Sequence, residues 1–295
     1  MIMPEWLMNT LTQVLSWLLA LTSSGAMALY DPPSPPGIPD APDAMQQEIT
    51  VLSFNIYTGT SDLDQRINGV VQTILNEMPD SFGLQEAHDI WRGRLKKELK
   101  DQYAIACDVG RVFGVNEGTP IFYLKDKYKL VDQGVFWLSD RPCIPSKGWD
   151  ASSWPRITGW AVLQDKETGF TYVHFNTHFD NAGATARINS ARLTADRINE
   201  MNLPTVLTGD LNCAPGSTPA QYLEAGGLRD LRGEAPGADT GGTFHAYAGR
   251  NSILDYVYAN HYLREAKEFK VIRDEYDGMY PSDHFAICAT LTLAN

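Results

Sequence analysis

Two short polar segments of this 295-residue chain combine residue types that can do acid–base chemistry. The first is TGDLN at residues 208–212, which follows a short apolar run at 204–207. That run predicts a buried strand, and Gly209 is expected to turn the backbone so that Asp210 and Asn212 leave the strand end on one side. There a carboxylate can take a proton from water while an amide fixes an oxygen of the substrate.

The second segment is PSDH at residues 281–284, directly before an apolar strand predicted for 285–293. Asp283 and His284 are adjacent, and such a pair can hold a metal ion or support positive charge against a phosphoryl oxygen. Asp255 lies on another predicted strand, where a buried charge without a partner would be costly. We therefore expect Asp255 to pair with His284, which keeps the imidazole oriented and cationic and leaves Asp283 free for the metal or the phosphate.

Three more predicted strands end in polar residues, namely SFN at 53–55, LQE at 84–86 and FNTH at 175–178. Local features explain Glu86 equally well as a ligand for a hard divalent cation and as a charge at the start of the following helix. His178 is explained either as a structural hydrogen-bonding group or as a donor to a phosphate oxygen. The functional interpretation is favoured because the other polar motifs are predicted at the same rim.

The ordered series of motifs resembles the metal-dependent endonuclease/exonuclease/phosphatase superfamily over about residues 49–293. This superfamily includes pancreatic deoxyribonuclease, inositol-polyphosphate 5-phosphatases and nocturnin-like enzymes. The resemblance implies an α/β (α+β) fold, a four-layered sandwich of two mixed β-sheets flanked by helices. The hydrophobic pattern agrees, because short apolar strands outnumber the amphipathic helices predicted at 64–78, 89–99 and 184–201.

The resemblance also implies a role for each motif. Glu86 matches the principal Mg²⁺ ligand, with Mn²⁺ as an alternative ion, and Asn55 lies beside it in the metal shell or on the phosphate. His178 stabilises the transition state or protonates the leaving oxygen, whereas Asp210 deprotonates the attacking water and Asn212 holds a phosphoryl oxygen. The predicted catalytic residues are His178, Asp210, Asn212, Asp255 and His284, and the predicted metal ligands are Asn55, Glu86 and Asp283.

Two arginines are the best candidates for binding the substrate. Arg156 lies in a Trp- and Gly-containing stretch that is expected to form a loop over a pocket, and Arg187 opens the helix after His178. Exposed arginines are usually plain surface charges. Lys166, however, is the only other Lys or Arg between these two, so they are the best placed to make bidentate contacts with a phosphate.

The net charge of −12 argues against an extended nucleic acid as the substrate, because nucleic-acid binding usually rests on basic surface. We therefore expect a Mg²⁺-dependent hydrolase of a small or lipid-like phosphoester. An endonuclease or exonuclease on DNA or RNA is the first alternative, and a non-catalytic binding protein on the same fold is the second. The complete set of motifs argues against the latter, since folding alone does not require these polar residues together. The oligomeric state is left open.

The cysteines give no sign of a zinc site or of a covalent mechanism. Cys107, Cys143, Cys213 and Cys288 lack metal-ligand spacing, so buried thiols are expected, with one or two disulfides as the alternative in an exported chain. Cys213 adjoins Asn212, but no motif activates it as a nucleophile.

The N-terminal residues 1–28 predict a signal peptide with cleavage after Ala28, because an apolar run at 14–21 precedes a small-x-small site. The run is shorter than the roughly 20 apolar residues that span a bilayer. Glu5 and the lack of a positive side chain favour the alternative, an amphipathic helix packed on the domain. Residues 29–48 predict a Pro-rich linker, and 49–295 the catalytic domain. A periplasmic or secreted protein is expected, with a cytoplasmic one as the alternative.

Overall fold

The computed structural model describes residues 48–108, 118–152 and 154–293. The predicted signal peptide and linker lie outside these residues except for Glu48, which begins the first strand. Among the described residues, no helix is long and apolar enough to cross a membrane. All four cysteines are free thiols; Cys143 is exposed and the other three are buried.

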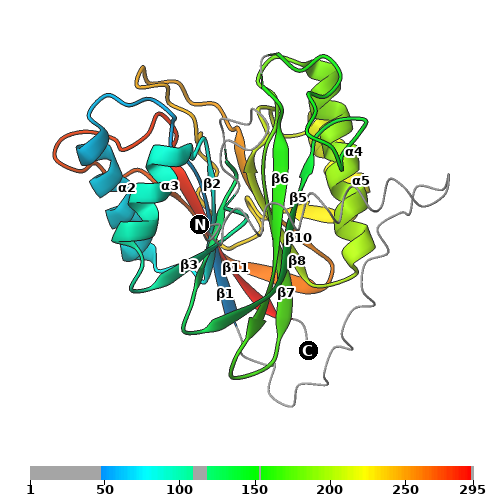
Figure 1. The fold of residues 1–295 in the computed structure, drawn as a ribbon, viewed down its shortest axis with the longest axis horizontal. Helices are drawn as coiled ribbons and strands as arrows, with labels where there is room; N and C mark the ends of the chain where they lie inside the picture. Colours follow the sequence, from blue (N-terminus) through cyan, green and yellow to red (C-terminus); the bar gives the residue numbers. More distant parts are fainter. Residues whose placement is uncertain (1–47, 109–117, 153, 294–295) are drawn as a thin grey trace, which may run out of the picture. The chain divides into compact units, whose positions relative to one another are not determined.

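The first sheet has six strands in the order β11-β12-β1-β2-β4-β3 (Figure 1). Only the neighbours β1 and β2 run parallel; every other pair is antiparallel. Its strands are β1 (Glu48–Asn55), β2 (Ser81–Gln85), β3 (Tyr103–Ala106), β4 (Ile121–Leu124), β11 (Leu263–Ile272) and β12 (Ala286–Leu293).

The second sheet also has six strands, in the order β5-β6-β7-β8-β10-β9. Here β7 and β8 form the one parallel pair. Its strands are β5 (Tyr128–Trp137), β6 (Ile157–Asp165), β7 (Thr171–His178), β8 (Thr205–Asp210), β9 (Leu228–Asp230) and β10 (Asp255–Asn260).

Helices cover the outer face of each sheet. Apolar side chains of α2 (Leu63–Glu77) and α3 (Asp89–Glu98) pack with β1, β2 and β12. On the other flank, α4 (Ala184–Met201) and α5 (Thr218–Ala225) pack with strands of the second sheet (Figure 1). The predicted four-layered sandwich of two mixed sheets and flanking helices is therefore confirmed.

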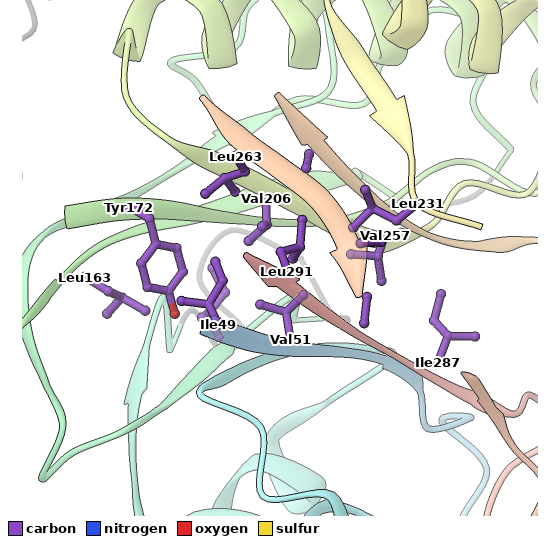
Figure 2. Close-up of a cluster of buried hydrophobic side chains, with 14 of the residues drawn as sticks. Ile49, Val51, Leu163, Tyr172, Val206, Leu231, Val257, Leu263, Ile287 and Leu291 are labelled. Atoms are coloured by element: carbon purple, nitrogen blue, oxygen red, sulfur yellow. The ribbon is translucent and has the colours of Figure 1, made fainter. Parts of the chain in front are cut away.

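The central core lies between the two sheets (Figure 2). Ile49 and Val51 of β1 pack with Leu291 of β12 on one side, against Val206 of β8 and Val257 of β10 on the other. All five side chains are fully buried, and each buried side chain of this size contributes about 1.5–3 kcal/mol to stability. The core fixes one sheet against the other, and so fixes the distance between polar residues at the strand ends.

A buried polar network crosses the same interface, consisting of Ser81, His174, Asn176, Gln85 and Thr208. The Nδ1 atom of His174 lies 2.7 Å from Oγ of Ser81, and its Nε2 lies 2.8 Å from Oγ1 of Thr208. Gln85 donates to Oδ1 of Asn176 at 2.7 Å. Because an unpaired polar group is costly in an apolar interior, these bonds select one register between the sheets.

Strand register brings the predicted site residues to one edge. Asn55 ends β1 opposite Gln85 of β2, so Glu86 follows at the next position. In the second sheet, His178 of β7 lies opposite Asp210 of β8 in the parallel ladder. Asp255 of β10 lies opposite the same residue in the antiparallel ladder of β8 and β10.

Candidate active site

A cavity of about 460 Å³ opens at this edge of the two sheets. Its lining combines carboxylates, imidazoles, two amides and one guanidinium, a composition suited to an anionic substrate and its counter-ions. Seven of the ten predicted site residues line it: Glu86, Arg156, His178, Asp210, Asn212, Asp283 and His284.

Asp210 lies at the centre of the site, at the end of β8. Its Oδ2 accepts a hydrogen bond from Nδ2 of Asn55 at 3.0 Å, and its Oδ1 accepts one from the backbone N–H of Asn212 at 2.9 Å. These bonds hold a buried carboxylate in one orientation at the cavity wall, as a general base requires.

The predicted turn at Gly209 is wrong. Gly209 lies within β8, and the left-handed residue is Asn212, with a φ of 47°. Glycine is needed at 209 for a different reason: a Cβ there would lie 2.5 Å from the carbonyl oxygen of Thr177 on the neighbouring strand. The close approach of β7 and β8, rather than a turn, explains this residue.

His178 faces three polar groups. Its Nδ1 lies 2.9 Å from Nη1 of Arg156, and its Nε2 lies 3.5 Å from Oδ2 of Asp210 and 3.1 Å from Nδ2 of Asn212. A guanidinium can only donate, so Nδ1 is the accepting nitrogen. The Nε2 edge of the ring faces the donor amide of Asn212, the carboxylate of Asp210 and the cavity, where the ring can contact a substrate oxygen.

His284 forms the predicted pair with Asp255. Nδ1 of His284 donates to Oδ2 of Asp255 at 2.8 Å, and Nε2 lies 3.8 Å from Oδ2 of Asp210. Burial by itself would lower the pKa of His284, but the carboxylates of Asp255 and Asp210 outweigh it and raise the pKa to about 10. His284 is therefore a cation at neutral pH.

Glu86 and Asp283 bring two carboxylates to the cavity wall. Glu86 has a left-handed backbone, with a φ of 61°, and its Oε2 accepts the backbone N–H of Thr58 at 2.8 Å. Burial raises the pKa of Asp283, and the charge of Glu86 adds to the rise. The two carboxylates repel each other, and a cation between them would relieve this repulsion. Their oxygens are a donor set that fits a hard divalent cation such as Mg²⁺.

Asn55, also predicted as a metal ligand, is fully buried and is not among the residues that line the cavity. Its Oδ1 accepts the backbone N–H of Tyr57 at 3.0 Å, and its Nδ2 lies 3.2 Å from Oε1 of Glu86 as well as 3.0 Å from Asp210. The oxygen that would bind a metal thus already accepts one hydrogen bond. This geometry favours a role in orienting the two carboxylates.

A second group of side chains could also hold a metal. Asp210, Asp255 and His284 each offer one ligand atom, and these atoms lie within 4.8 Å of one another. Coordination there requires His284 to lose a proton, because an imidazolium has no free lone pair. The raised pKa of His284 opposes that loss, so Glu86 and Asp283 are the better candidates.

The two predicted substrate arginines differ in position. Arg156 lines the cavity and contacts His178, whereas Arg187 is not among the lining residues and donates from Nη1 to the carbonyl of Asp180 at 2.9 Å. The structure therefore brings Arg156, but not Arg187, to the candidate phosphate position. Cys213 is a buried thiol whose pKa is raised by that burial, which argues against a cysteine nucleophile.

Six residues of the cavity wall were not predicted from the sequence: Tyr57, Ser152, Trp154, Asn181, Phe244 and Leu254. Loops give no periodic signal, so their side chains could not be assigned to a face. One signal was present for Trp154, because it lies two residues before Arg156 in a stretch already predicted to cover a pocket.

Known proteins match both the fold and the sequence. A model of the endonuclease/exonuclease/phosphatase family matches residues 52–284. A solved member of this family from Bacteroides thetaiotaomicron is 31% identical, with a TM-score of 0.76, and the match covers 84% of this chain and 99% of that one. The resemblance predicted from the ordered motifs is confirmed. No curated protein matches the chain.

Two further solved structures are similar to this chain. A mannosyl-6-phosphatase from Bacteroides thetaiotaomicron is 31% identical, with a TM-score of 0.73, and the match covers 82% of this chain and 99% of that one. TDP2 from Caenorhabditis elegans is 21% identical with a TM-score of 0.65, and the match covers 84% of this chain and 98% of that one. At that identity, TDP2 shares the fold alone.

Proposed function

Since the chain belongs to the endonuclease/exonuclease/phosphatase family, we propose that it is a Mg²⁺-dependent hydrolase of a small or lipid-like phosphoester. One observation carries the proposal: a carboxylate base, a cationic imidazole and two further carboxylates converge on one cavity of about 460 Å³. Phosphoryl transfer to water needs this combination of groups.

Each residue of the cavity has a role that its contacts support. Asp210, held by Asn55 and the backbone of Asn212, takes the proton from the attacking water. The His284 cation stabilises negative charge that develops on the phosphoryl group, and His178, which lines the same cavity, contacts a substrate oxygen. Glu86 and Asp283 would hold Mg²⁺, or Mn²⁺ as the alternative, which would supply further neutralisation of that charge.

The size and charge of the site favour a small substrate. Pockets of about 300–1,000 Å³ typically enclose small ligands, and the net charge of −12 opposes binding of a long polyanion. The 31% identical mannosyl-6-phosphatase supports a phosphomonoester of modest size. The nuclease alternative rests on a fold that TDP2 shares.

A panel of phosphoesters tests the proposal. The wild type is assayed on phosphomonoesters, phosphodiesters and plasmid DNA with Mg²⁺, with Mn²⁺ and after chelation, alongside Asp210→Asn. We expect small phosphomonoesters to be hydrolysed with the higher kcat/KM, chelation to abolish turnover, and Asp210→Asn to lower kcat by about 10²–10⁴-fold. Plasmid cleavage that outpaces every small phosphoester would instead establish the nuclease alternative.

A further inference from the structure

We propose that Trp154, Asn181 and Ser152 form a subsite for the hydroxylated ring of a sugar phosphate, next to the position of its phosphoryl group. The three residues line the same cavity as His178 and Asp210. This inference rests on the proposed phosphoesterase function, and it names the class of leaving group.

Trp154 is the first reason. Its side chain is 46% exposed although it lines a cavity, so a large apolar surface faces the space that a substrate would enter. Indole rings bury more area than most side chains, and leaving one open to water forgoes that stabilisation. A ligand with an apolar face would cover the ring and recover it.

Described residues on both sides of Trp154 are anchored to the rest of the domain. Oδ2 of Asp180 accepts hydrogen bonds from both the backbone N–H and the hydroxyl of Ser152, each at 3.1 Å. Asp150 accepts the backbone N–H of Ala186 at 2.6 Å, which ties the loop to the start of α4. At its other end, the carbonyl of Arg156 accepts the backbone N–H of Leu138 at 2.8 Å.

The polar groups beside the indole indicate hydroxyl groups on the ligand. The one hydrogen of the Ser152 hydroxyl is shared between two acceptors, because its Oγ lies 3.1 Å from Oδ2 of Asp180 and 3.1 Å from Oδ1 of Asn181. The NH₂ group of Asn181 thus remains a donor, and nothing within hydrogen-bonding distance accepts from it among the residues that the structure describes. A pyranose offers CH groups to an indole and hydroxyls to an amide, whereas an acyl chain would leave the amide unpaired.

The phosphoryl position lies close to this subsite along the chain. Arg156, two residues after Trp154, lines the cavity and contacts His178. Two nearby residues of the chain therefore contribute a cation for the phosphate and an aromatic face for the leaving group. The ester of a primary ring substituent, such as a hexose 6-phosphate, spans two adjacent subsites of this kind.

The test compares Trp154→Ala with a matched control, Trp149→Ala. Trp149 lies on the same loop and is 37% exposed, but it does not line the cavity. Substrates are mannose 6-phosphate, cyclohexylmethyl phosphate, which keeps the ring without hydroxyls, and glycerol 3-phosphate, which keeps hydroxyls without a ring. Trp154→Ala should lower the ratio of kcat/KM for mannose 6-phosphate over glycerol 3-phosphate by roughly ten-fold. Trp149→Ala should leave that ratio unchanged.

Asn181→Ala separates the hydroxyl contact from stacking. It should lower kcat/KM for mannose 6-phosphate relative to cyclohexylmethyl phosphate, because only the sugar offers a partner to the amide. An unchanged ratio in both Trp154→Ala and Asn181→Ala overturns the subsite while the phosphoesterase function stands.

Binding provides a readout independent of turnover. Calorimetric titration of mannose 6-phosphate should give a lower Kd for the Asp210→Asn variant than for the double variant that carries both Asp210→Asn and Trp154→Ala. If the wild type hydrolyses no phosphoester, the proposed function fails, yet this difference in Kd still supports the subsite. Equal Kd values, or no binding to either protein, overturn it.

Discussion

Asp255 accepts a hydrogen bond from Nδ1 of His284 at 2.8 Å and thereby joins β10 to the segment that precedes β12. Both residues are buried, and the opposite edge of the imidazole lies 3.8 Å from Asp210. The pair places a positive charge beside the candidate base. Because His284 is already protonated, it can stabilise negative charge in the transition state but cannot act as the base.

We expect Asp255→Asn to lower kcat by about 10²-fold or more, because an amide cannot hold the charged form of His284. The pKa of His284, followed by NMR titration, should fall from its raised value in the same variant. Asp165→Asn is the matched control, since Asp165 is a buried acid that accepts backbone N–H groups in the β6–β7 hairpin, away from the cavity. A variant with normal kcat and a lowered pKa would remove the electrostatic role of His284.

Arg156 and Arg187 should behave differently. Arg156→Ala removes a cation from the cavity wall and the contact to Nδ1 of His178, so both a higher KM and a lower kcat are expected. Arg187→Ala removes a hydrogen bond to a backbone carbonyl outside the cavity lining, so the effect on kcat/KM should stay within about three-fold. Steady-state kinetics on one phosphomonoester checks both. Equal losses would show that Arg187 reaches the substrate.

His174 should make stability depend on pH. Burial lowers its pKa to about 3, so the ring is neutral in the fold, whereas in the unfolded chain it titrates near 6.5. Because the pKa of His174 is lower in the fold than in the unfolded chain, the stabilisation from the neutral buried ring is complete above pH 6.5. It is lost as the pH falls from 6.5 towards 3, where the unfolded chain binds a proton that the fold does not. Urea unfolding at pH 7.5 and 4.5 should show this loss.

The matched variants for this test are His174→Gln and His261→Gln. His174→Gln removes the titrating group and should reduce the difference in unfolding free energy between the two pH values. It should also lower stability at pH 7.5, because the contacts to Ser81 and Thr208 are lost. His261 is exposed, so its replacement should change neither quantity. An unaltered pH difference in His174→Gln would contradict the assignment.

Much of the site could be predicted because its residues lie at the ends of strands. A strand and its parallel neighbour end at the same edge, so Asp210 and His178 were expected together from their motifs alone. The position of Asp255 followed from the cost of burying an unpaired charge. These inferences use local rules that tertiary packing does not override.

The features that sequence reasoning missed depend on tertiary contacts. Gly209 is explained by the carbonyl of Thr177 on another strand, which no local pattern reveals. α5 has only eight residues, too few for a clear periodicity, although Ser217 and Pro219 mark its start. The strand β9, Leu228–Asp230, is shorter still. The direction in which Arg187 leaves its helix is likewise set by packing.

Arg66 is another residue whose role depends on tertiary contacts. Its side chain is 1% exposed and donates to the carbonyls of Ile56 and Tyr57, each at 2.6 Å, and to that of Pro281 at 2.9 Å. It therefore joins the loop after β1 to the segment that carries Asp283. Among the described residues no carboxylate forms a salt bridge with it; backbone carbonyls and the rings of Tyr57 and Trp91, each 5.0 Å from the guanidinium carbon, surround its charge.

We expect Arg66→Lys to weaken metal binding, because a single ammonium cannot reach both segments with the fixed fork of a guanidinium. Loosening the segment before Asp283 should raise the half-saturating concentration of Mn²⁺, measured by calorimetry on the protein without substrate. Stability should also fall by about 2 kcal/mol, the contribution of a hydrogen bond to a charged group. Arg92→Lys is the matched control, since Arg92 is also buried but pairs with Asp108 and the carbonyl of Ala87. If both variants lose stability and neither changes the affinity for Mn²⁺, Arg66 supports only the fold.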